Sequence, residues 1–94
     1  MLDAKVDANQ SEIVKALRKV GAQVLSLASI GKGCPDLLVG YAGKLYLMEV
    51  KGENGRFTGD QVIFHNIWYK HVVTVHNEIE ALRAIGVIMQ DSEV

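Results

Sequence analysis

The sequence predicts a small α/β protein in which one mixed β-sheet is flanked by helices, in the order α-β-β-β-α-β-α. The chain has 94 residues, close to the roughly 100–150 residues of a typical domain, so we expect a single domain over residues 1–94. Stretches with apolar residues at helical spacing alternate with stretches rich in strand formers. Two strand-like stretches are joined by a two-residue turn and a third follows a helix, which predicts antiparallel and parallel pairing in one sheet.

The first helix is expected between residues 4 and 21. Asp7 and Gln10 fit a capping box, and Gly21 fits the stop of this helix. A strand is then expected over residues 22–28, which are rich in strand formers. The apolar residues at helical spacing are Ile13, Leu17 and Val20.

A β-hairpin is expected next. Residues 36–41 and 44–51 read as strands, and Ala42-Gly43 between them is a connection of the length that closes a hairpin. The preceding segment IGKGCP holds two glycines and the only proline of the chain, so we expect a loop there.

The second half of the chain predicts a helix, a strand and a last helix. Thr58 and Gln61 fit a capping box before a helix over residues 60–71. A short buried strand follows over residues 72–76, and Asn77 fits the N-cap of the third helix.

Composition narrows the class of protein. Hydrophobic residues make up 49% of the chain and charged residues 22%, which excludes a disordered tail or a disulfide-stapled mini-protein. The single cysteine, Cys34, cannot form an internal bridge, and no apolar run reaches the roughly 18 residues that a bilayer requires. The N-terminus lacks the apolar core of a signal peptide. We therefore expect a cytoplasmic protein without a membrane partner.

Charge and apolar content bear on partners. The net charge is −1, but residues 1–70 carry nine basic and seven acidic side chains, while residues 71–94 carry one basic and four acidic ones. The first part thus has a modest positive excess, suited to a polyanion. A domain of this size buries only about 60–65% of its unfolded surface, so the high apolar content favours a homodimer.

The chemistry is concentrated in the stretch CPDLLVGYAGKLYLMEVKG. Side chains alternate along a strand, so Glu49 and Lys51 share one face while Val50 points to the other. A hairpin turn at residues 42–43 places Asp36 opposite Glu49. Two carboxylates and the Val50 carbonyl are the oxygen ligands that Mg²⁺ prefers, and Lys51 could orient a water or stabilise charge on a phosphate.

The alternative for this stretch is an exposed, salt-linked strand face, the usual explanation of an isolated Glu-x-Lys. Pro35-Asp36, its register opposite Glu49 and the glycine-rich loops on both sides favour a site. The acidic and basic side chains also gather at one end of two apolar strands, which a solvated face does not explain.

The motif Pro35-Asp36, thirteen residues, then Glu49-Val50-Lys51 resembles the PD-(D/E)xK nuclease signature. The wider frame is similar to the VRR-Nuc (virus-type replication–repair nuclease) family, in its stand-alone viral and bacterial form. That frame places a Glu on the first helix, here Glu12, and a Gln early in the next, here Gln61. The similarity covers roughly residues 10–86 and implies a restriction-endonuclease-like core. It also implies that the protein acts in a bacterial cell or a phage-infected host.

The resemblance implies roles for these residues. Asp36, Glu49 and the Val50 carbonyl would bind Mg²⁺ or Mn²⁺, Lys51 would assist the water, and Glu12 would hold a metal or its water. For Glu12 an exposed helix acid paired with Lys15 or Lys19 remains the alternative. For Gln61 the alternative is the capping box, and one residue could serve both purposes.

Other residues near the motif have weaker roles. Cys34 has no His–acid partners in the sequence, so we interpret it as a bystander. His65 lies one turn after Gln61 and could line the cleft, although a satisfied, partly buried histidine is the favoured interpretation. The candidate phosphate contacts, for which ordinary loop solubility is the alternative, are Ser29, Lys32, Arg56 and Lys44.

These features predict a metal-dependent, structure-specific DNA endonuclease of the replication and repair type. The resemblance implies a Holliday-junction resolvase, a dimer with branched DNA, such as a four-way junction, as its partner. A nuclease that nicks one strand or cuts flaps is one alternative. A non-catalytic nucleic-acid-binding module that has kept the fold is the other.

Overall fold

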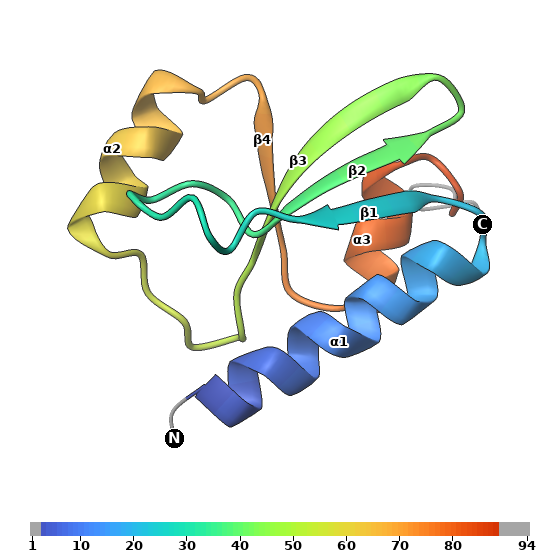
Figure 1. Ribbon diagram of the computed structural model, residues 1–94, viewed down its shortest axis with the longest axis horizontal. Helices are drawn as coiled ribbons and strands as arrows, with labels where there is room; N and C mark the ends of the chain where they lie inside the picture. The colour runs from blue at the N-terminus through green and yellow to red at the C-terminus, as the bar shows by residue number, and fades with distance from the viewer. Residues whose placement is uncertain (1–2, 89–94) are drawn as a thin grey trace, which may run out of the picture.

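The computed structural model describes residues 3–88, and side chains from residue 9 to residue 88. The predicted order of elements and the mixed sheet are confirmed (Figure 1). The elements are α1 (Asp3–Lys19), β1 (Gln23–Ser26), β2 (Leu37–Tyr41), β3 (Lys44–Val50), α2 (Gly59–Ile67), β4 (Val72–Val75) and α3 (Glu78–Ala84).

The four strands form one sheet in the order β1-β2-β3-β4. β1, β2 and β3 pair antiparallel, and β4 pairs with β3 in parallel after the α2 crossover. The predicted hairpin turn is correct: Ala42 and Gly43 have φ values of 52° and 80°, the left-handed pair that a tight two-residue turn requires. This turn sets Leu37 opposite Met48.

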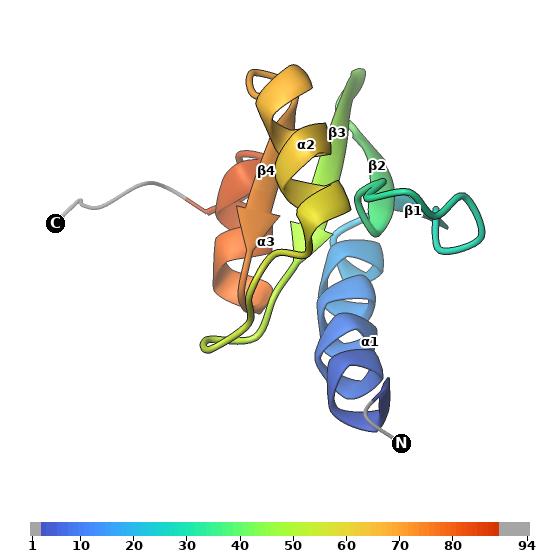
Figure 2. The ribbon, with the colours of Figure 1, turned by 90° about the vertical axis from the view of Figure 1, so that its left-hand side faces the viewer.

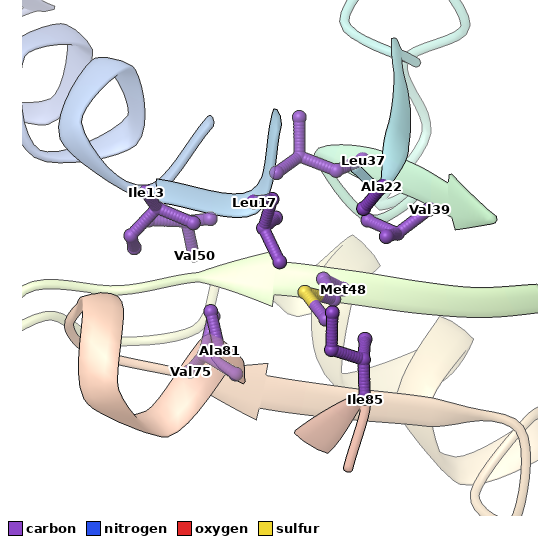
Figure 3. Packing of buried hydrophobic residues seen from close by; sticks show 10 residues of the cluster. All are labelled: Ile13, Leu17, Ala22, Leu37, Val39, Met48, Val50, Val75, Ala81 and Ile85. Atoms are coloured by element: carbon purple, nitrogen blue, oxygen red, sulfur yellow. The ribbon is translucent and has the colours of Figure 1, made fainter. Parts of the chain in front are cut away.

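The sheet lies between two helical layers of unequal packing. α1 and α3 cover one face and α2 lies over the other (Figures 1 and 2). α2 contributes no buried residue. Figure 3 shows the core on the α1 and α3 side, and its buried members are Ile13, Leu17, Ala22, Leu37, Val39, Met48, Val50, Val75, Ala81 and Ile85.

The predicted end of α1 and the predicted start of α3 are correct. The N–H of Gly21 bonds the Arg18 carbonyl at 2.9 Å and the N–H of Ala22 bonds the Leu17 carbonyl at 3.0 Å. Gly21 has a φ of 95°. These two hydrogen bonds and the left-handed glycine form a Schellman motif at the end of α1. Asn77 caps α3, its side chain accepting from the Glu80 N–H at 2.8 Å.

Other boundaries differ from the prediction. α1 begins at Asp3, so Asp7 lies inside the helix and the expected capping box there is wrong; Ala4 and Lys5 are good helix formers that extend the first turn. The Asp7 side chain lies outside the described residues. α2 ends at Ile67 rather than near residue 71, because the chain turns back toward β4 and the His71 N–H bonds the Trp68 carbonyl at 2.7 Å.

The first strand is also shorter than expected, spanning Gln23–Ser26. The Ser26 hydroxyl accepts from the Ala28 N–H at 3.2 Å, which draws the backbone out of the strand. In the described part of the chain, no helix combines the length and apolar character needed to cross a membrane.

Candidate active site

The candidate site lies where β2 begins and β3 ends, on the α2 side of the sheet. Asp36 directly precedes β2, Glu49 lies near the end of β3 and Lys51 follows that strand. Because Leu37 pairs with Met48, the antiparallel register continues with Asp36 opposite Glu49. The predicted convergence of the two carboxylates is therefore seen in the hairpin register.

Asp36 is anchored to the backbone of β3. Its Oδ2 accepts from the Val50 N–H at 2.7 Å. A residue's N–H and C=O point to the same edge of a strand, and the Lys51 N–H points to the other edge, where it bonds the Val75 carbonyl at 3.0 Å. The Val50 carbonyl thus faces the Asp36 side, beyond the first residue of β2, where no strand residue pairs with it.

Glu49 is the buried charged residue of the described chain, with 1% of its surface exposed. Burial and the neighbouring Asp36 carboxylate raise the pKa of Glu49 to about 8, and the Lys51 ammonium partly opposes this shift. A carboxylate held in this way is costly to ionise unless a cation compensates it.

Gln61 connects the elements of the site. Its Oε1 accepts from Lys51 Nζ at 2.8 Å and from the Thr58 N–H at 2.9 Å, while its Nε2 donates to Glu49 Oε2 at 3.2 Å. The Thr58 hydroxyl accepts from the Gln61 N–H at 3.2 Å and completes the predicted capping box. Gln61 therefore caps the start of α2 and also connects Glu49 to Lys51. These are the two purposes that the sequence left open for this residue.

The loops on both sides of the site are packed against it. Gly33 lies so close to the Asp60 carbonyl that a Cβ there would clash with the start of α2, so the loop before Asp36 requires glycine. In the loop after β3, Lys51 Nζ donates to the Arg56 carbonyl at 2.8 Å. Lys51 Nζ also lies 5.1 Å from the centre of the Phe57 ring, an attractive cation–π contact.

His65 contacts the site more closely than the sequence indicated. Its Nε2 lies 3.7 Å from Glu49 Oε1, and both atoms are buried without a hydrogen-bond partner among the described residues. Burial and the Lys51 charge lower the pKa of His65. The favoured interpretation, a satisfied histidine, does not match this geometry. Its spacing of one turn from Gln61 was the signal that could have revealed it.

Cys34 lies beside the two carboxylates. Burial, then the charges of Glu49 and Asp36, raise the pKa of its thiol. A thiol with a raised pKa stays protonated at neutral pH and is a poor nucleophile, consistent with the interpretation of Cys34 as a bystander.

Among the described residues, the other predicted site side chains make no hydrogen bond or ion pair with Asp36 or Glu49. Glu12 is exposed on α1 and makes no hydrogen bond or ion pair with another described residue. Its metal role stays a prediction. Lys44 starts β3 at the hairpin turn, five residues before Glu49 and so about 16 Å along the strand at roughly 3.3 Å per residue. A phosphate at the carboxylates would not reach it. Ser29, Lys32 and Arg56 are exposed on the flanking loops.

The donor atoms suit a hard cation that keeps several waters. Over the described residues, no group of three or more His, Cys, Asp or Glu side chains is already arranged around a metal position. Mg²⁺ is commonly held by one or two carboxylates with water completing its shell. Asp36, Glu49 and the Val50 carbonyl match that requirement, and the unpartnered Glu49 Oε1 is the atom that most needs a cation.

Comparison of the chain with protein-family models, with curated proteins and with solved structures finds no match. The similarity to VRR-Nuc nucleases therefore rests on the motif and its spacing.

Proposed function

We propose that this protein is a metal-dependent, structure-specific DNA endonuclease of the VRR-Nuc type, similar to Holliday-junction resolvases. One observation carries the proposal: Glu49, buried with a pKa raised to about 8, is joined through Gln61 to Lys51 and lies beside Asp36. A buried acid next to a second acid and a lysine serves no packing purpose. It has the parts needed for phosphodiester hydrolysis.

The residues divide the chemistry among them. When bound, Mg²⁺ or Mn²⁺ would supply a reactive water and neutralise charge on the phosphate. Asp36, Glu49 and the Val50 carbonyl would hold that ion. Gln61 fixes the Lys51 ammonium at 2.8 Å, where it can orient the attacking water or stabilise the developing charge. The role of Glu12 remains to hold a metal or its water.

The substrate class follows from size and surface. Sequence-specific DNA interfaces bury about 1,000–2,500 Å² of protein, a large demand on 94 residues. Recognition of the backbone and of branched shape is less demanding. Ser29, Lys32 and Arg56, exposed around the site, are the proposed phosphate contacts.

A homodimer is part of the proposal. The α2 side carries a groove of about 580 Å³ lined by Leu38, Leu45, Leu47, Trp68 and Val72 among others. Leu45, Ile67 and Tyr69 nearby are 74%, 72% and 69% exposed. A second copy on this face would cover apolar area that one copy leaves in water, and its two-fold symmetry would match a four-way junction.

Two other functions stay open to test. A nuclease that cuts one strand at nicks or flaps would use the same site without a symmetric dimer. A non-catalytic DNA-binding module would have no use for Asp36 and Glu49, because without a metal these carboxylates repel phosphate.

The test is cleavage of a labelled panel of duplex, splayed-arm, flap and four-way-junction DNA, with Mg²⁺, with Mn²⁺ and with chelator. We expect metal-dependent nicks at symmetric positions on opposing strands of the junction and far weaker attack on duplex. Sedimentation equilibrium at micromolar concentration should give about twice the 10.3 kDa chain mass. A monomer that cuts flaps as readily as junctions would favour the one-strand nuclease, and DNA binding without cleavage under any metal would favour the binding module.

A further inference from the structure

Two buried polar atoms face each other across the site without a hydrogen bond. They are Glu49 Oε1, on β3, and His65 Nε2, on α2, separated by 3.7 Å. The Glu49 side chain is 2% exposed and the His65 side chain 18%. Buried polar atoms in proteins nearly always have a partner, so this pair indicates a group that both atoms can bind.

The pair is held in place from both sides. Gln61 Nε2 fixes the other oxygen of Glu49 at 3.2 Å, leaving Oε1 free. The Phe57 ring lies against the His65 ring with their centres 4.8 Å apart. His65 and Gln61 are also four residues apart on α2, on one face of that helix. The geometry is therefore set by the same contacts that build the site.

The separation is too long for a hydrogen bond and suits two ligands of one ion. Hydrogen-bonded N and O atoms lie about 2.7–3.2 Å apart. Ligands at about 2.1 Å from an ion lie roughly 3.0–3.6 Å apart for angles from a right angle to 120°. A small movement of either side chain brings this pair into that range.

We infer that His65 is a metal ligand of this protein, donating Nε2 to the ion that Glu49 Oε1 binds and thereby giving the site a preference for divalent transition ions over Mg²⁺. Mg²⁺ selects oxygen donors, whereas an imidazole nitrogen favours transition ions, with Mn²⁺ the weakest binder among them. This inference rests on the proposed function, because it takes Glu49 as a metal ligand.

The test uses the metals alone, with the full chain. Mn²⁺ bound to the wild type should show a ¹⁴N coupling from imidazole in pulsed electron paramagnetic resonance. His65→Gln replaces the imidazole with an amide, which can still donate a hydrogen bond but is a poor metal ligand. This variant should lose the coupling. Calorimetry should show at least a tenfold weaker affinity of this variant for Mn²⁺ and less than a threefold change for Mg²⁺. His71→Gln, an exposed histidine on the turn after α2, is the matched control and should behave as wild type.

The outcomes separate this inference from the function on which it rests. Stoichiometric Mn²⁺ binding without a ¹⁴N coupling would overturn it and leave the proposed nuclease site standing. Equal loss of Mn²⁺ and Mg²⁺ affinity in His65→Gln would also overturn it, since that result describes a residue that only positions Glu49. If the wild type binds neither ion, the proposed function fails and the inference falls with it. Circular dichroism of each variant verifies the fold.

Discussion

The two faces of the sheet are built for different purposes. The face toward α1 and α3 is closed by apolar side chains, among them Ile13, Leu17 and Met48, each 0% exposed. The face toward α2 holds Glu49 buried beside Lys51 and Gln61, and leaves Ile63 and Ile67 of α2 59% and 72% exposed. Apolar packing on the first face stabilises the fold, whereas the buried Glu49 carboxyl on the second face destabilises it.

This difference explains how the fold can contain a buried carboxyl group. A buried carboxyl with an unpartnered oxygen destabilises the fold that contains it. α1 and α3 pack on the opposite face, and the side chains of Glu49 and Lys51 both form hydrogen bonds with Gln61 of α2. The core can therefore remain intact while the α2 side changes its charge or occupant. Substitutions on the two faces should therefore have separable effects.

The largest expected effect is on cleavage. Asp36→Asn and Glu49→Gln should each abolish DNA cleavage, because each removes an anionic ligand while changing little volume. Asn at position 36 can still accept from the Val50 N–H, so the fold should persist, as thermal unfolding would verify. DNA binding without metal should survive or improve. Near-wild-type cleavage by either variant would refute the site.

The core face should show the largest effect on stability. Leu17→Ala should lower the free energy of unfolding by about 2–5 kcal/mol, because it leaves a cavity at a fully buried position. Ile63→Ala, on the α2 side, should change it by less than about 1 kcal/mol. Urea denaturation of both variants measures the contrast, and equal losses would contradict the division between the faces.

Lys51→Ala separates catalysis from metal binding within the site. Turnover should fall by at least about 10²-fold, the range for losing a positioned acid–base or electrostatic group. Metal affinity, followed by calorimetry, should change much less, because Lys51 is not a proposed ligand. A variant that lost metal affinity but kept its rate at saturating metal would give Lys51 a different role.

The pH dependence of stability isolates Glu49. Its pKa rises from 4.5 to about 8 on folding, so between these values the folded chain holds a proton that the unfolded chain has released. The metal-free protein should lose stability as pH rises from about 5 to 8, by roughly 2–4 kcal/mol. Glu49→Gln should flatten this dependence. Thermal unfolding across the pH range is the measurement, and a variant with an unchanged slope would assign the effect elsewhere.

The sequence predicted the geometry of the candidate site where local rules determine it. The two-residue turn at 42–43 fixes the hairpin register and with it the approach of Asp36 to Glu49. The capping-box pattern of Thr58 and Gln61 predicts the start of α2. These features depend on neighbours along the chain or across one hairpin.

What the sequence did not predict depends on how separate elements meet. The one-turn spacing of His65 from Gln61 places both residues on one face of α2, but the distance from His65 to Glu49 depends on the position of α2 over β3. The length of α2 was overestimated because its apolar residues continue past Ile67, while the chain has to turn into β4. The role of Glu12 stays a prediction, since α1 packs on the other face of the sheet (Figure 2).

The central claim is that the sheet end on the α2 side is a metal centre built on Asp36 and Glu49. Calorimetric titration of Mn²⁺ and Mg²⁺ into the wild type, Asp36→Asn and Glu49→Gln tests it most directly. We expect saturable binding to the wild type that weakens at least tenfold in both variants while thermal unfolding shows them folded. Equal affinity in all three proteins, or no binding to the wild type, would contradict the account.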